Sequence, residues 1–322
     1  MRFLCTGDWQ LRFQRPRSRI DIDYALAQEK KVEWLLATAV DEGCAYLLQP
    51  GDFFDSCHPS FDTMRRYIEL FKRYEVKILC VRGQHDLRYQ STNIDNIPLA
   101  VLEAAGVVEV ASRNGICVRG RDPSAHAPIV IYGCSWGDDV FYVDVDSADD
   151  TINVLLIHKM VTADTNLQWP GQTDFVTASS LLEENSYDLV VCGDNHKSLI
   201  FKDSSSRYVV NCGSLMRANI DQVDHKPVSY IYESDSRSIV RRRLTNIAPA
   251  EAVFAIDYAE RELEKKKDLD LFIRSISKSK KVGVDFLKNL YTRLDQMEVP
   301  KGVRKIIDDG VKKFGELEGD GW

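Results

Sequence analysis

Side chains that can bind metal ions follow five apolar segments of the sequence, each time close to the segment's end. Carboxylate, imidazole and amide groups are ligands that divalent cations use in proteins. Gathered in one place, these groups would repel one another unless cations neutralised them, so they point to a metal site. The five segments and their motifs are Arg2–Thr6 with Gly7-Asp8-Trp9-Gln10, Ala45–Leu48 with Gly51-Asp52, Val76–Val81 with Gly83-Gln84-His85-Asp86, Ile152–Ile157 with His158, and Asp188–Cys192 with Gly193-Asp194-Asn195-His196.

The central motif of the series runs from Gly51 to Asp55, with the sequence GDFFD. The apolar run before it predicts a strand, and Pro50-Gly51 turns the backbone, which puts Asp52 at the strand's carboxyl end. Open α/β sheets bind their ligands at that end of their strands. A single Asp after a strand is more often a helix cap or turn residue. Repetition of the pattern favours the metal site, and we expect the five ends to converge on one edge of the sheet.

Helical segments separate the first three of these strands. Tyr24–Glu42 and Phe61–Tyr74 repeat apolar residues at helical spacing, and Gly43 follows the first as a C-terminal stop. The order strand, loop, helix, strand predicts an α/β fold. Further predicted helices are 97–105 and 175–185, and further predicted strands are 107–110, 115–118, 129–133 and three antiparallel ones at 208–211, 228–232 and 239–244.

Composition sets the outer bounds. The 322 residues suit one large domain, or a large and a small one. No apolar run approaches the roughly 18 to 20 residues that span a bilayer, and the N-terminus turns polar too soon for a signal peptide. The eight cysteines form no C-x-x-C pair, which fits a reducing cytoplasm. A net charge of −7 argues against general coating of nucleic acid, although a local basic path can exist.

The segment Leu11–Ile20 carries four arginines and no acidic residue, with Phe13 and Pro16 between them. A guanidinium fork matches phosphate oxygens, so these side chains could grip phosphates beside a scissile one. A merely solvated loop is the other interpretation. The predicted substrate-binding residues are Arg12, Arg15, Arg17 and Arg19.

The order of the five motifs, followed by Asn211-Cys212-Gly213-Ser214-Leu215-Met216-Arg217, resembles the calcineurin-like metallophosphoesterase superfamily. Within it, the sequence is most similar to SbcD-type DNA repair nucleases, including their compact phage and prophage members. The resemblance covers about residues 1–245. It implies a four-layered α/β/β/α sandwich with two divalent metal ions, usually manganese with magnesium as the alternative. It also implies hydrolysis of phosphodiester bonds by a hydroxide that bridges the metals.

The resemblance implies a role for each motif residue. Asp52 would bridge the two metals, and His85 would act on the scissile phosphate while Asp86 orients its imidazole. The first metal would be held by Asp8, Gln10, Asp52 and His196, and the second by Asp52, Gln84, His158 and Asp194. Gln10, Gln84 and Asp194 replace the His, Asn and His that are usual in the superfamily. Each keeps an oxygen donor, which shifts the preference from zinc toward manganese or magnesium.

The chain changes character after residue 245, where charged helical sequence begins. We therefore expect a catalytic domain at 1–245 and a helical cap or partner-docking region at 246–322. In SbcD-type proteins this region faces DNA and docks on a coiled-coil ATPase of the SbcC type. The unit of two helices separated by Pro300, at 285–314, could dock in that way. DNA is the expected partner, a homodimer is left open, and no membrane is involved.

Two other function classes stay open. One is a phosphatase or cyclic-nucleotide phosphodiesterase for small substrates, which is favoured if the arginine loop folds away from the metals. The other is a non-catalytic scaffold whose altered ligands no longer hold metal.

Overall fold

A computed structural model describes residues 1–88, 95–118, 127–141, 151–163, 175–255, 291, 294–296, 302–305 and 307–308. Contacts divide the chain into two units, Met1–Glu260 and Arg261–Trp322. In the smaller unit, residues 294–296 and 302–305 are helical, and Arg304 donates a 2.5 Å hydrogen bond to Asp295. Most of the predicted docking unit at 285–314 lies outside the described residues, so that expectation and the boundary at 245 stay predictions.

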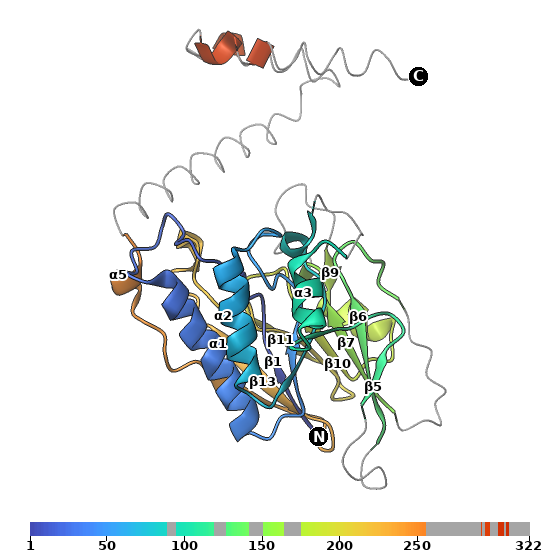
Figure 1. The fold of residues 1–322 in the computed structure, drawn as a ribbon. Coiled ribbons are helices and arrows are strands. Elements are labelled where there is room, and N and C mark those ends of the chain that lie inside the picture. The colour runs from blue at the N-terminus through green and yellow to red at the C-terminus, as the bar shows by residue number, and fades with distance from the viewer. Residues whose placement is uncertain are drawn as a thin grey trace. The chain divides into compact units, whose positions relative to one another are not determined.

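Two mixed sheets form the centre of the larger unit (Figure 1). The first has the order β14-β13-β1-β2-β3-β4. Its strands β1 to β4 are parallel, while β13 is antiparallel to β1 and β14 is antiparallel to β13. The bounds are Arg2–Cys5 (β1), Tyr46–Gln49 (β2), Lys77–Cys80 (β3), Glu109–Val110 (β4), Val228–Glu233 (β13) and Ser238–Arg243 (β14).

The second sheet has the order β11-β12-β10-β7-β6-β5. Strands β6, β7, β10 and β12 are parallel, and β5 and β11 are antiparallel strands at the two edges. The bounds are Ile116–Val118 (β5), Ile129–Cys134 (β6), Ile152–Ile157 (β7), Leu189–Cys192 (β10), Leu199–Lys202 (β11) and Tyr208–Asn211 (β12). A separate pair joins Val161–Thr162 (β8) and Val176–Thr177 (β9).

Strand pairing differs from the sequence prediction in two ways. The five motif-bearing strands do not share one sheet: β1, β2 and β3 lie in the first and β7 and β10 in the second. The expectation of three antiparallel strands after residue 207 is confirmed for β12 only on the side of β11, because on its other side β12 pairs in parallel with β10. Strands β13 and β14 return to the first sheet as an antiparallel hairpin.

Three helices lie side by side on the outer face of the first sheet (Figure 1). They are α1 (Tyr24–Asp41), α2 (Phe61–Lys72) and α3 (Pro98–Ala104), and α4 (Ala178–Glu183) covers the second sheet. Asp23 and Ser60 cap the first two by accepting the N–H groups of Leu26 and Thr63 at 2.8 Å and 3.1 Å. Within the described ranges, no helix is long and apolar enough to cross a bilayer.

Three apolar layers hold the two sheets and their helices together. Alternate residues of each strand face opposite sides, so Leu4 of β1 packs under the helices while Phe3 faces the second sheet. In the same way Leu156 of β7 lies between the sheets and Leu155 packs toward α4. All eight cysteines are free, and six are buried. The observed architecture is therefore the four-layered α/β/β/α sandwich that the family resemblance implies.

Leu156 provides a test of the layer between the sheets, because its side chain is 0% exposed. We expect Leu156→Ala to lower the free energy of unfolding by about 2 to 5 kcal/mol through lost burial and a residual cavity. The control Val240→Ala, on the 46% exposed side chain of β14, should change it by less than about 0.5 kcal/mol. Urea unfolding of both variants measures the difference, and equal midpoints would contradict this packing.

Candidate metal centre

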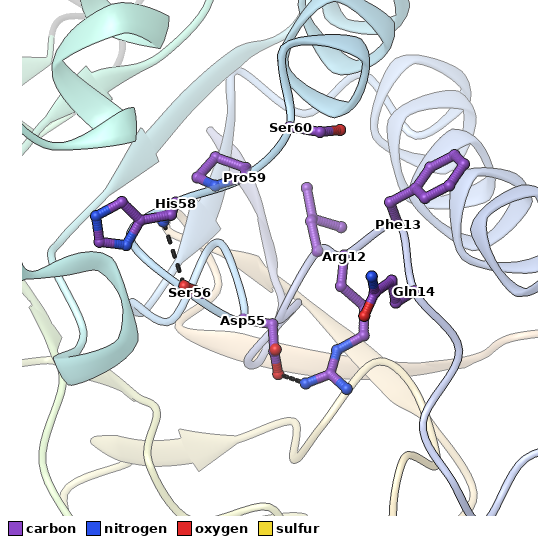
Figure 2. A pocket seen from close by; sticks show the side chains of 9 residues that line it. Arg12, Phe13, Gln14, Asp55, Ser56, His58, Pro59 and Ser60 are labelled. Carbon is purple, nitrogen blue, oxygen red and sulfur yellow. Dashed lines mark hydrogen bonds and ion pairs between the residues drawn. The ribbon is translucent and has the colours of Figure 1, made fainter.

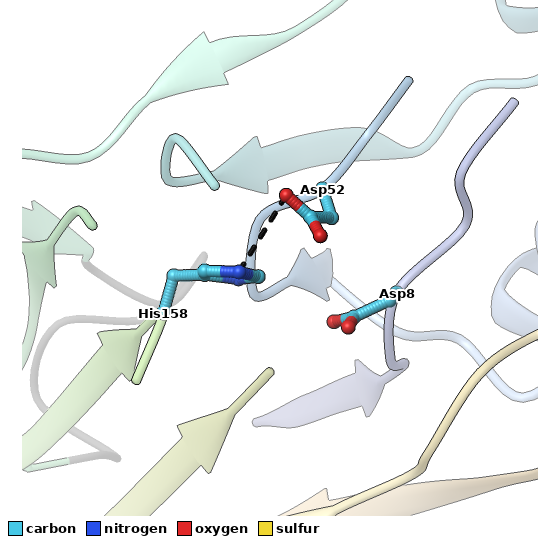
Figure 3. A group of neighbouring side chains, drawn as sticks. All are labelled: Asp8, Asp52 and His158. Carbon is cyan, nitrogen blue, oxygen red and sulfur yellow. Dashed lines mark ion pairs between the residues drawn. The ribbon is translucent and has the colours of Figure 1, made fainter. Parts of the chain in front are cut away.

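Asp8, Asp52 and His158 meet at the carboxyl ends of β1, β2 and β7 (Figure 3). Each offers one ligand atom, and these atoms all lie within 4.8 Å of one another. All three side chains are buried. Two of them follow strands of the first sheet and the third follows a strand of the second, so the face-to-face packing of the sheets creates the cluster.

Asp52 stands at the centre of the hydrogen-bond network. Its Oδ1 accepts the backbone N–H of His85 at 3.0 Å and lies 3.5 Å from His158 Nε2. Its Oδ2 accepts a 3.4 Å bond from the amide of Gln10. Both carboxylate oxygens therefore face groups that other motifs supply.

His158 offers a lone pair to this cluster. Its Nδ1 lies 2.6 Å from the carbonyl oxygen of Pro50, which can only accept, so Nδ1 carries the proton. In the neutral ring, Nε2 is then an unprotonated nitrogen, and it lies 2.6 Å from Gln84 Oε1 as well as near Asp52. Three electron-rich atoms face one another there, and a cation between them removes the repulsion.

Asp194 links the two sides of the site. The Gln84 amide donates to Asp194 Oδ1 at 2.9 Å, and the backbone N–H of Asp194 donates to Asp8 Oδ2 at 3.1 Å. His196 lies on the Asp8 side, with Nε2 3.5 Å from Asp8 Oδ2 and 3.3 Å from Gln10 Nε2. The structure thus brings together all seven residues that the sequence predicts as metal ligands.

Three glycines of the motifs lie where any larger residue would collide with a side chain of the metal cluster. A Cβ on Gly51 would collide with the His158 ring, one on Gly83 with the Asp52 carboxylate, and one on Gly193 with both Asp8 and His158. Glycine therefore allows the ligand side chains to approach the neighbouring backbone closely.

Three of the seven residues have left-handed backbone conformations. The φ angles are +46° for Gln10, +50° for Asp52 and +71° for Asp194. This region is uncommon for residues other than glycine and costs about 1 to 3 kcal/mol each. Such strain gathers at functional sites, where surrounding structure holds it in place.

Electrostatics at the site favours a bound cation. Burial, followed by the negative charges of Asp52 and Asp194, raises the pKa of Asp8 well above its usual value. Burial also lowers the pKa of His196, so its ring favours the neutral form that metals require. Buried carboxylates, a histidine lone pair and amide oxygens fit divalent ions such as manganese or magnesium.

His85 and Asp86 have different surroundings from each other. His85 is 42% exposed, with Nδ1 2.9 Å from the Asp55 carbonyl and Nε2 3.8 Å from Asp52 Oδ2. The prediction that Asp86 orients this ring is wrong, because its buried carboxylate accepts three backbone N–H groups, from Phe53, Phe54 and Gly83. Asp86 instead ties the GDFFD loop to the GQHD turn, and burial raises its pKa to about 6.

The four arginines of the loop are not equivalent. Arg12 forms an ion pair with Asp55, Arg15 donates to the Asp21 carbonyl at 2.7 Å, and Arg17 is exposed. Arg19 is only 4% exposed and holds the Asp21 carboxylate with two 2.7 Å bonds. Its guanidinium is therefore occupied inside the protein, which corrects the expectation that all four face a substrate.

Two residues that contact this site were not identified from the sequence. Asp55 orients His85 through its carbonyl and Arg12 through its carboxylate, and its place in the GDFFD motif was an available signal. Gln222 donates to His196 Nδ1 at 3.1 Å from the short helix Ile220–Gln222. It belongs to no recognisable motif, so only the fold reveals it.

The comparisons with known proteins agree with this geometry. The sequence model of the family described as calcineurin-like phosphoesterase matches residues 1–198. No curated protein matches the sequence. A solved structure of a dimetal phosphatase from Danio rerio has a TM-score of 0.50 and 10% sequence identity, covering 77% of this chain and 96% of that one, and this likeness shows the fold alone. Because the family match spans more than half of the chain, the protein belongs to the calcineurin-like phosphoesterases, which are metal-dependent hydrolases of phosphoesters.

Proposed function

We propose that the protein is a dinuclear-metal phosphodiesterase that cleaves DNA, as SbcD-type nucleases do. The metal dependence of this proposed activity rests on one observation. Asp8, Asp52 and His158 form a buried cluster, and their ligand atoms lie within 4.8 Å of one another. The Nε2 lone pair of His158 faces the Asp52 carboxylate there, an arrangement that a bound cation stabilises.

We assign the seven residues to two metal positions that share Asp52. Gln10 and His196 complete the first position with Asp8, and Gln84, His158 and Asp194 complete the second. Oxygen donors predominate, so manganese is the proposed ion and magnesium the alternative. When bound, two such ions polarise the phosphoryl oxygens and generate a nucleophile from water at neutral pH.

His85 is the proposed catalytic side chain of the protein itself. It is the most exposed histidine of the cluster, and because Nδ1 lies against the Asp55 carbonyl, its Nε2 is the nitrogen that faces Asp52, at 3.8 Å. A substrate above Asp52 would meet Nε2 first. A protonated imidazole there can donate to a phosphoryl oxygen or to the leaving oxygen.

Support for a nucleic-acid substrate comes from the loop beside the metal centre. Arg15 and Arg17 lie in its exposed part, whereas Arg12 is paired with Asp55. Guanidinium groups near a scissile phosphodiester suit the neighbouring phosphates of a chain better than a small monoester. The structural likeness to a dimetal phosphatase rests on 10% identity and does not choose between the two substrate classes.

The wider assembly is part of the same proposal. We propose DNA as the partner of the catalytic face and an SbcC-type coiled-coil ATPase as the partner of the C-terminal helices. A homodimer is compatible with both. These partners follow from the resemblance to SbcD-type nucleases, and pull-down with a purified coiled-coil ATPase would test the second.

Substrate preference tests the proposed activity. With manganese, we expect hydrolysis of bis-p-nitrophenyl phosphate and of single-stranded DNA to exceed hydrolysis of p-nitrophenyl phosphate, because the site would hold a diester between arginines and metals. The control Asp52→Ala removes the shared ligand and should abolish both metal retention after dialysis and turnover. Preference for the monoester would favour the small-substrate phosphatase, and absence of tightly held manganese would favour the scaffold.

The role of His85 gives a second prediction. We expect His85→Ala to keep manganese while turnover falls by about 10²- to 10⁴-fold, the usual contribution of a general acid. Metal analysis after dialysis and a rate measurement on one sample separate the two effects. If the variant lost metal in proportion to activity, His85 would be a ligand instead.

A further inference from the structure

We propose that a pocket beside the metal centre binds the nucleobase next to the scissile phosphate. This rests on the proposed nuclease function and states how its substrate is held. The pocket has a volume of about 340 Å³, within the roughly 300 to 1,000 Å³ of small-molecule sites. In the view of Figure 2, Phe13 and His58 lie on opposite sides of it, and the ion pair of Arg12 with Asp55 lies below both.

The pocket is joined to the proposed catalytic residues through the backbone. Leu11, which lines it, donates its N–H to the Phe53 carbonyl at 2.9 Å, one residue after Asp52. Asp55, which also lines it, holds the His85 ring through its carbonyl. A phosphate over Asp52 would therefore have this pocket as its immediate neighbour.

The pocket's chemistry suits a neutral planar ring better than an anion. Arg12 is already paired with Asp55, so the pocket has no free guanidinium for a second phosphate. Phe13 is 56% exposed and offers an aromatic face, and Gln14 adds an exposed amide. Bases stack on aromatic side chains, and amides pair with base edges.

An abasic scan along a short single-stranded oligonucleotide tests this subsite. We expect one abasic position beside the cleaved bond to slow the wild-type protein, and Phe13→Ala to erase that position effect. Phe13→Ala should also raise KM for intact DNA by about 5- to 150-fold, the range of one lost stacking contact. Hydrolysis of bis-p-nitrophenyl phosphate, which has no base, should change less than twofold.

The matched control is Phe61→Ala, because Phe61 is 94% exposed and does not line the pocket. An equal effect of Phe61→Ala, a persistent position effect in Phe13→Ala, or equal loss on both substrates would overturn the subsite. A wild-type protein that hydrolyses bis-p-nitrophenyl phosphate but no DNA would overturn the nuclease assignment together with the subsite.

A second inference comes from Gln222 and does not depend on the pocket. Its Oε1 accepts the N–H groups of Ala218 and Asn219 at 2.7 Å and 3.0 Å, which fixes the amide so that Nε2 is the group that donates to His196. In a neutral imidazole, the nitrogen that accepts leaves the proton on the other one. Asp8 Oδ2 lies 3.5 Å from Nε2 and can accept that proton, so we assign the proton of His196 to Nε2, even though the Gln10 amide nitrogen lies 3.3 Å from the same atom.

His158 has the opposite tautomer, because the Pro50 carbonyl accepts from its Nδ1. A metal-bound histidine normally gives its other N–H to a carbonyl or carboxylate, as His158 does. We infer that Gln222 acts as a positioning residue that holds His196 in the tautomer unsuited to binding through Nε2. The first metal position is thereby weaker than the second. This rests on the proposed ligands, and the tautomer itself is measurable without metal.

The variant Gln222→Glu tests this inference. A carboxylate keeps an acceptor for Ala218 and Asn219 and offers another to a proton on His196 Nδ1. ¹⁵N NMR of the metal-stripped protein should show that proton on Nε2 in the wild type and on Nδ1 in the variant. Calorimetry with manganese should show two binding events in the wild type, the weaker of which tightens about 10-fold or more in the variant.

The control Gln14→Glu adds the same charge away from His196 and should change neither measurement. A wild-type ring already protonated on Nδ1, or two equal binding events, would overturn the role of Gln222. Absence of any manganese binding would overturn the proposed function, and with it the weaker position, even if NMR found the expected tautomer.

Discussion

The carboxylates of Asp8 and Asp52 repel each other at a buried site, and the surrounding structure holds them there. Like charges at about this separation cost roughly 3 to 4 kcal/mol at an effective dielectric constant near 20. The left-handed residues Gln10, Asp52 and Asp194 add about 1 to 3 kcal/mol each. Together these costs are a sizeable part of the roughly 5 to 15 kcal/mol that a domain has available. A metal ion that binds only the folded state would offset part of this free-energy cost.

The rest of the fold supplies the opposing stability. Apolar layers above, between and below the sheets fix the strand ends, and backbone bonds then fix the loops that leave them. Asp86 shows how a charged residue can serve this purpose: its carboxylate accepts three N–H groups and joins the loop of β2 to the turn of β3. The rigidity of the site is therefore built into the backbone around Asp52.

Sequence patterns predicted the parts of this site that depend on local order. Five apolar runs ending in ligand residues predicted where Asp8, Asp52 and His158 stand, because strand direction fixes the end at which a motif emerges. The division of those strands between two sheets was not predicted by the runs themselves, since a buried strand looks alike in either sheet. The bonds of Asp86 and Gln222 were equally hidden, because their partners are distant or are backbone groups that any sequence provides.

The anchoring of the arginine loop shows how such hidden contacts shape function. At one end, Leu11 is bonded to the GDFFD segment on both sides, and at the other Arg19 grips Asp21 and donates to the Arg217 carbonyl at 2.7 Å. Stacking of Arg19 between Tyr24 and Phe254 holds that end further. The segment between is thus tethered at both ends while Phe13 and Arg17 stay exposed. Side chains pre-positioned in this way lose less entropy on binding a substrate, so Arg19 can serve binding without touching the substrate.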